Sequence, residues 1–156
     1  MKREVVYFFF FIYLARVTTP QGKTYLMEKE KYELEFIVNT SPKILYNFLV
    51  TPSGLSEWFS DDVNIRNDIY TFFWDGEESK AKLLTKRKDE YAKFQWVDED
   101  DVPEDPNTYF EFKIEVDHMT NETALLVTDF SEPDEMDSAQ KLWESQTSEL
   151  KHILGL

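Results

Sequence analysis

The stretch SEPDEMDSAQKLWESQTSELKHILGL, residues 131–156, decides how this chain folds. Apolar and large side chains recur in it at steps of three and four, with charged residues between them, which is typical of a helix with one buried face. The members of that face are Met136, Ala139, Leu142, Trp143, Gln146, Leu150, Ile153 and Leu154. A single helix of this kind after a run of strands needs a sheet that is curved enough to receive it.

The two ends of this helix carry residues that suit the helix dipole. Ser131 is the expected N-cap residue, and Pro133 and Asp134 fit the first turn. Lys151 and His152 fit the last turn, where a positive charge is favourable. We therefore expect the helix to begin directly after Ser131.

Most of the preceding chain predicts short strands, because apolar and polar side chains alternate in it. The strand-like segments are residues 31–40, 63–65, 69–74, 79–88, 91–97, 109–116 and 123–130. Ser41-Pro42 and Thr51-Pro52 each combine a capping side chain with a proline that suits a first helical turn, which predicts two short helices. The expected buried sides of these helices consist of Ile44, Leu45, Phe48 and Leu49 in the first and Leu55, Trp58 and Phe59 in the second.

Asp75 and Gly76 lie between two strand-like segments and predict a hairpin, because a type I′ turn needs positive φ at both central positions. The order of elements is strand, helix, helix, about six antiparallel strands and a long helix. This order predicts an α+β fold in which a curved antiparallel sheet of about seven strands wraps the C-terminal helix. The sequence shows no repeat or linker, and its 156 residues fit one domain.

Composition excludes several classes of partner and site. The chain has 17 Lys and Arg against 31 Asp and Glu, and its formal charge of −14 repels nucleic acid and anionic lipid surfaces. Cysteine is absent, which excludes disulfides, thiolate zinc sites and a cysteine nucleophile and favours a cytoplasmic location. Aromatic residues make up 16% of the chain, so many rings must fill a core or line a cavity.

Residues 5–15 form an apolar run behind Lys2 and Arg3. The run is too short to span a bilayer comfortably, and Glu4 and the lack of a small-residue cleavage site argue against an export signal. Three interpretations stay open: translation that begins at Met27, an added strand or partner-contacting arm, and a genuine export signal. We treat residues 1–26 as an N-terminal extension to the domain of residues 27–156.

Three groups of residues carry a resemblance to a known family. They are TPSGLSEWF at residues 51–59, FFWDG at residues 72–76, and Leu142-Trp143 followed by Leu150 in the last helix. With the order of elements, they resemble the helix-grip fold of the START-like (SRPBCC) superfamily. Within it, the chain looks most like homologues of the Hsp-ninety ATPase activator and uncharacterised bacterial START-like domains. The resemblance covers residues 29–156.

The resemblance implies a groove or cavity between the curved sheet and the C-terminal helix, where members of the superfamily bind lipids, hormones or polyketides. Residues that match groove-facing positions are Trp58, Phe59, Phe72, Trp74, Phe94, Trp96, Phe112, Ile114, Met136, Leu142, Trp143 and Gln146. The alternative for each is ordinary core packing, in which the side chains fill the space themselves. Gln146 and Thr128 are candidates to orient a ligand, since a few polar groups do so in apolar pockets.

The sequence shows no arrangement that is typical of catalysis or of a metal site. His118 and His152 lie in a turn and at a helix end, away from a plausible nucleophile, and we expect no metal or other cofactor. Residues 98–105 hold six carboxylates but lack the ligand spacing and central glycine of a calcium loop, which favours a solvated loop.

The first functional hypothesis is therefore a non-catalytic module that holds a small hydrophobic or amphipathic molecule between sheet and helix. The alternative is a protein-interaction or chaperone-accessory domain that meets a basic protein partner through its acidic surface. A homodimer stays open as well. An enzyme of the cyclase or hydratase type, as found among relatives, would need a buried acid or base facing the groove. The pattern of the sequence shows no acid or base in such a position.

Overall fold

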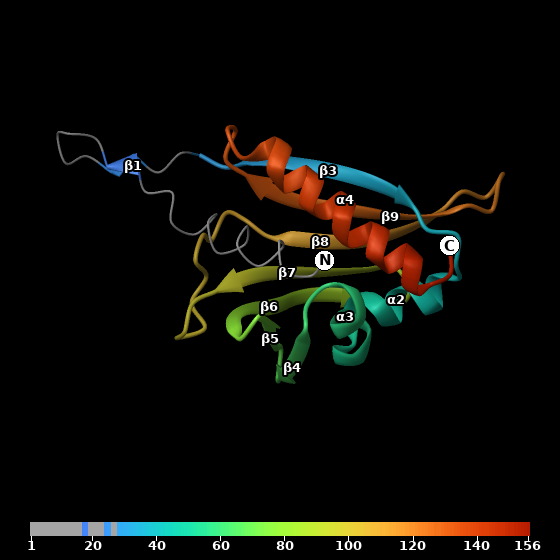
Figure 1. Cartoon of the computed structure of the whole chain (residues 1–156), viewed down its shortest axis with the longest axis horizontal. Helices are drawn as coiled ribbons and strands as arrows, with labels where there is room; N and C mark the ends of the chain where they lie inside the picture. The colour runs from blue at the N-terminus through green and yellow to red at the C-terminus, as the bar shows by residue number, and fades with distance from the viewer. Residues whose placement is uncertain (1–16, 19–23, 26–27) are drawn as a thin grey trace.

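The computed structural model describes residues 17–18, 24–25 and 28–156, and Figure 1 shows a long helix running diagonally across one face of a curved sheet. The strands of this sheet are β3 (Glu30–Ile37), β4 (Asp62–Arg66), β5 (Ile69–Trp74), β6 (Glu77–Arg87), β7 (Tyr91–Val97), β8 (Phe110–Val116) and β9 (Thr123–Ser131). The helices are α2 (Pro42–Val50), α3 (Pro52–Trp58) and α4 (Met136–Ile153). A separate two-stranded sheet pairs β1 (Val17–Thr18) with β2 (Thr24–Tyr25).

The main sheet has seven strands in the order β3-β9-β8-β7-β6-β5-β4, and every neighbouring pair is antiparallel. The first strand of the sheet therefore pairs with the last, which brings the two ends of the domain together. Helices α2 and α3 follow β3 and lie at one end of the sheet, beside α4 (Figure 1). The predicted α+β architecture is confirmed.

Strand β5 shows why the sheet has one apolar face. Tyr70, Phe72 and Trp74 are buried, whereas the residues between them are only half-buried, as the period of two requires. The predicted hairpin follows at once: Asp75 has φ 50° and Gly76 has φ 88°, so both central residues adopt the positive φ of a type I′ turn.

The two short helices form as predicted, and a shared threonine joins them. Ser41 accepts a hydrogen bond from the amide of Ile44, and Thr51 ends α2 while its hydroxyl accepts from the amide of Gly54 in α3. Ile44 was expected on the buried side of α2 but is 47% exposed. The helix instead buries Leu45, Tyr46, Leu49 and Val50.

The prediction that Ser131 caps the long helix is wrong. Ser131 is the last residue of β9, where it pairs with Glu30, and its hydroxyl donates to the carbonyl of Glu132. The N-cap residue of α4 is Glu135, which makes no side-chain capping bond. Lys151 and His152 do lie in the last turn of the helix. Ala139, Trp143, Gln146, Thr147 and Leu150 form its buried face.

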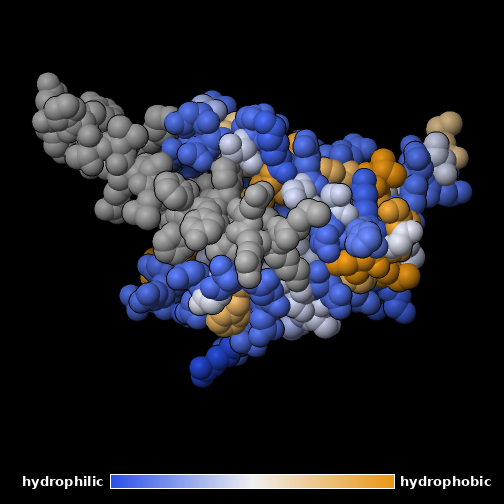
Figure 2. All heavy atoms as spheres, in the orientation of Figure 1, coloured by the Kyte–Doolittle hydropathy of each residue, from blue (hydrophilic) through white to orange (hydrophobic). Residues whose placement is uncertain are grey.

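On the face that Figure 2 shows, the described residues are mostly hydrophilic, and apolar atoms gather at the end of the molecule where α2 and the C-terminus lie. Ile44 on α2 and Leu156 at the C-terminus are among the exposed apolar residues. No helix among the described residues has the length and apolar character that a membrane crossing requires. The predictions for residues 5–15 lie outside the described residues.

Gly54 allows α3 to approach α2 closely. A Cβ atom at this position would lie 2.3 Å from the carbonyl oxygen of Asn47 and 2.6 Å from the Cα of Phe48. Both are backbone atoms, so a larger residue can be accommodated only if the two helices move apart. We expect Gly54→Ala to lower the free energy of unfolding by about 1–3 kcal/mol, as overpacking typically does.

Chemical denaturation followed by circular dichroism measures this change. Glu57→Ala, an exposed substitution in the same helix, is the control and should shift the free energy of unfolding by less than about 0.5 kcal/mol. If Gly54→Ala were as stable as the control variant, the close packing of α2 on α3 would be wrong.

Candidate functional site

Aromatic side chains from the sheet, from the end of α3 and from α4 meet in one cluster, which we call the aromatic cluster. Its members are Trp58, Phe59, Tyr70, Phe72, Trp74, Phe94, Trp96, Phe110, Phe112 and Trp143. Phe59 lies at its centre, with its ring centroid 5.0 Å from that of Phe72 and 5.9 Å from that of Trp143. The cluster therefore joins the sheet to α4.

Several rings of the cluster are fixed by hydrogen bonds from their polar tips. Trp58 Nε1 donates to the carbonyl of Phe48, and the hydroxyl of Tyr70 donates to the carbonyl of Val50, each at 2.9 Å. Since a buried donor without a partner is costly, these bonds hold the rings in one orientation and attach α2 to the sheet.

The structure brings most of the predicted ligand-binding residues together between the sheet and α4. The buried ones are Trp58, Phe59, Phe72, Trp74, Phe94, Phe112, Ile114, Trp143 and Gln146. Trp96, Met136 and Leu142 are only half-buried. Rings of the set contact one another directly, so they form part of the core, and their role in holding a ligand stays a prediction.

Asp129 is a site residue that sequence reasoning missed. Its Oδ2 accepts a hydrogen bond from Trp143 Nε1 at 2.9 Å and one from the hydroxyl of Tyr32 at 3.3 Å, and its Oδ1 accepts from the amide of Phe130 at 2.8 Å. Asp129 falls in step with Leu125 and Val127, two buried residues of the same strand. Burial in β9 does not alternate, because Ala124, Leu126 and Thr128 are buried as well, so the sequence offered no periodic signal for Asp129.

The surroundings of Asp129 act on its acidity in opposite directions. Burial raises the pKa of Asp129 to about 6, whereas the bonds from Trp143, the Phe130 amide and Tyr32 and the charge of Lys29 lower it. Burial and the neighbouring carboxylate raise the pKa of Tyr32 well above its usual range, so its hydroxyl keeps its proton. At neutral pH the group is therefore a carboxylate held by neutral donors.

Gln146 places a second acceptor in the same interface. Its side chain is 3% exposed, and its Nε2 lies 3.5 Å from the carbonyl oxygen of Phe59, which also accepts from Trp74 Nε1 at 2.9 Å. Because that carbonyl can only accept, the amide nitrogen must face it, which fixes the orientation of the side chain. Gln146 Oε1 is buried and has no hydrogen-bond partner among the described residues.

Thr128, the other polar candidate, does not belong to this interface. Its hydroxyl donates to Glu33 Oε2 at 3.3 Å. Neighbouring residues of a strand point to opposite faces, so Thr128 lies on the face opposite to Val127 and Asp129. Its burial comes from side chains of the outer face, and we withdraw it as a ligand-orienting residue.

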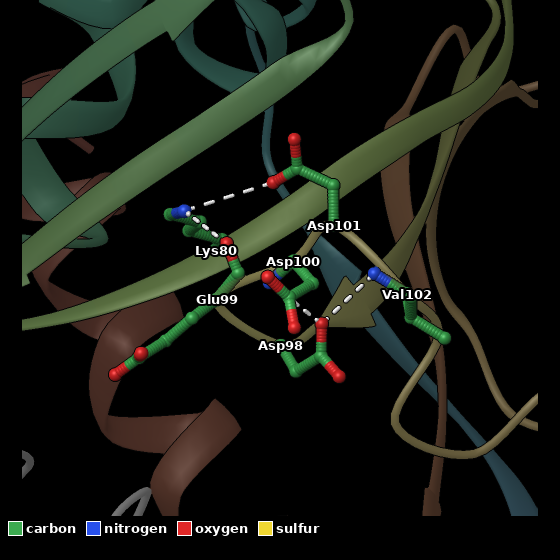
Figure 3. A network of polar contacts seen from close by, with 6 residues as sticks. All are labelled: Lys80, Asp98, Glu99, Asp100, Asp101 and Val102. Atoms are coloured by element: carbon green, nitrogen blue, oxygen red, sulfur yellow. Dashed lines mark hydrogen bonds and ion pairs between the residues drawn. The ribbon is translucent and has the colours of Figure 1, made fainter.

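The acidic loop, residues 98–105, is held in place by hydrogen bonds from its own backbone amides to the side chain of Asp98. Figure 3 shows Asp98 Oδ1 accepting hydrogen bonds from the amides of Asp100 and Val102, each at 2.9 Å. Lys80 Nζ lies 3.6 Å from Asp101 Oδ1 and so offsets part of the charge. Among the described residues no group of three or more acidic or histidine side chains is placed to hold a metal ion.

Comparison with known proteins gives a family and a fold. A model of the START-like superfamily domain matches residues 26–156. The solution NMR structure of BfR322 from Bacteroides fragilis has 39% sequence identity and a TM-score of 0.59, and the alignment covers 83% of this chain and 94% of that chain. None of the curated proteins compared with the chain gives a significant match.

Two more distant structures share the fold. The solution structure of the Aha1 dimer from Colwellia psychrerythraea has 21% identity and a TM-score of 0.66, covering 78% of this chain and 93% of that chain. The crystal structure of MLL2253 from Mesorhizobium loti has 16% identity and a TM-score of 0.64, covering 81% and 97%. The predicted resemblance to the START-like superfamily and the predicted helix-grip fold are confirmed.

The raised pKa of Asp129 predicts a specific dependence of stability on pH. The native state binds this proton more tightly than the unfolded state, so the contribution of Asp129 to stability grows as the pH falls and is lost as the pH rises through about 6. Asp129→Asn has no such proton. We expect wild type to gain up to about 3 kcal/mol relative to Asp129→Asn between about pH 8 and pH 4.

Urea denaturation of both proteins across this pH range gives the difference between their free energies of unfolding. Titration of the other carboxylates cancels in this difference, because both proteins contain them. Tyr32→Phe removes one donor to the carboxylate and should move the transition to higher pH, because that hydrogen bond lowers the pKa of Asp129. A stability difference that is flat with pH would show that Asp129 does not titrate as the structure indicates.

Proposed function

Because the chain belongs to the START-like superfamily, we propose that it binds a small apolar or amphipathic molecule between the sheet and α4. Domains of this superfamily commonly bind hydrophobic ligands, and the match spans residues 26–156. The proposal concerns binding without a chemical step.

One observation carries the proposal: apolar side chains of α4 and of β3 that pack against the core stay half-buried. Met136 on α4 is one of them, and Leu34 and Phe36 on β3 are others. An apolar ligand that covers such surface gains about 25 cal/mol per Å².

Asp129 is a buried acid, which a cyclase or hydratase would need, but its contacts favour a structural role. Trp143 and Tyr32 both donate to Oδ2, and a backbone amide donates to Oδ1. Both lone pairs of Oδ2 are thereby occupied, and Oδ1 holds the backbone at Phe130. We therefore assign Asp129 to holding α4 on the sheet.

Native mass spectrometry of protein purified from its own host tests the proposal. We expect an added mass that persists in the native spectrum and disappears when the protein is denatured. Titration with Nile red, a neutral apolar dye, then gives an affinity for variants. Met136→Lys places a charge at the half-buried end of the interface and should weaken dye binding by about tenfold or more.

Ser138→Lys is the matched control, because residue 138 is exposed on the same helix and receives the same side chain. It should bind the dye as wild type does. Wild-type protein that carries no added mass and gives no saturable dye binding would contradict the proposal. Equal binding by Met136→Lys and Ser138→Lys would contradict the location.

A second candidate function is favoured by the way the acidic loop is presented. The loop projects beyond the end of the sheet between β7 and β8 (Figure 1), and the bonds to Asp98 keep it in one conformation. A rigid acidic surface is suited to a basic protein partner, since complementary charge speeds association. In this alternative the partner is a protein rather than a small molecule.

Replacing Glu99 with Gln and Asp100 with Asn removes two exposed charges while Asp98 keeps the loop folded. If the loop is the interaction surface, proteins recovered with the wild-type chain at low salt should be lost with this double variant. Recovery of the same proteins with both chains would count against a role for the loop.

A further inference from the structure

We propose that the molecule bound between the sheet and α4 carries a hydrogen-bond donor, such as a hydroxyl or ammonium group, and not a carboxylate. This inference rests on the proposed function and names the chemical class of its ligand. It follows from the polar groups that the described residues place in an otherwise apolar interface.

The unpartnered Gln146 Oε1 is the first of these groups. Its Nε2 faces the carbonyl oxygen of Phe59, so the amide cannot turn over without bringing two acceptors together. The oxygen is therefore presented as an acceptor from the buried face of α4, one turn from Trp143. A buried acceptor without a donor destabilises a protein by about 1–3 kcal/mol, which a donor on the ligand would recover.

The carboxylate of Asp129 gives the interface a negative charge. It is bonded to Trp143 Nε1, and the ring of Trp143 stacks on that of Phe59, whose carbonyl Gln146 approaches. Both groups therefore belong to the interface around Phe59 and Trp143. The charge of Asp129 would repel a ligand carboxylate there, whereas it would not repel a hydroxyl or ammonium group.

The interior offers no positive charge to offset an anionic ligand. The buried polar residues in the described part of the chain are Ser60, Thr123, Thr128, Ser131, Gln146 and Thr147. None of them is basic. Lys29 is half-buried, and its charge already acts on Asp129. An unpaired carboxylate is costly to bury, and the net charge of −14 repels it further.

Three probes of equal chain length separate the possibilities: 1-decanol, its methyl ether and decanoate. The alcohol can donate, the ether can only accept, and decanoate carries a negative charge. We measure displacement of Nile red from the wild-type protein at neutral pH. The alcohol should bind at least about tenfold more tightly than either of the other two, since one recovered hydrogen bond of about 1.4 kcal/mol is a factor of ten.

Gln146→Leu locates the effect, because it removes the acceptor and keeps an apolar side chain of similar size. The affinities of this variant for the alcohol and the ether should fall within about twofold of each other. Gln140→Leu makes the same chemical change on the same helix but outside its buried face, and it should keep the wild-type preference. Circular dichroism establishes that each variant is folded.

The outcomes distinguish this inference from the proposed function. Binding of the ether or of decanoate as tightly as the alcohol to wild type would overturn the donor requirement and leave the binding function standing. Saturable binding of none of the probes, together with no dye binding, would overturn both. A preference for the alcohol that survives in Gln146→Leu would overturn the assignment to Gln146. The comparison of the three probes on the wild-type protein does not depend on whether any variant folds.

Discussion

The stacking of Phe59 on Trp143 is the contact on which the arrangement of this protein depends. Their ring centroids are 5.9 Å apart with an interplanar angle of 16°, and Phe59 meets Phe72 of β5 edge-on at 5.0 Å. Phe59 thus connects the last helix to the sheet, and Phe112 of β8 adds a direct ring contact to Trp143 at 5.7 Å. Phe59 follows α3, whose start is set by Thr51, so the capping of two short helices determines where the ring lies.

Most buried polar side-chain atoms have a hydrogen-bond partner in the protein, and two among the described residues have none. The indole nitrogens of Trp58, Trp74 and Trp143 each donate to a defined oxygen at 2.9 Å. These bonds make the interface rigid, since rotating any ring would leave a buried donor unpaired. Asp89 Oδ1 and Gln146 Oε1 are the exceptions among the described residues, and of the two Gln146 lies on the buried face of α4.

Much of the candidate site could be predicted from periodicity, and its polar chemistry could not. The apolar faces of β5 and α4 follow from spacing alone, so Phe72 and Trp143 were expected inside and are inside. Asp129 was overlooked because the role of a single acidic residue in an apolar strand cannot be recognised until its hydrogen-bond partners are known. Ser131 was assigned to the helix because it has the chemistry of a cap, but pairing with Glu30 extends β9 through it.

By itself the sequence determined the type and order of the elements, the Asp75-Gly76 hairpin and the buried side of β5. These features depend on side chains a few residues apart, which act on backbone geometry directly. Only the tertiary structure decided that Trp143 and Tyr32 share the carboxylate of Asp129, and that Gln146 reaches the carbonyl of Phe59, 87 residues away along the chain. Hydrogen bonds of this kind have no local signature, because they exist only after the apolar faces have packed.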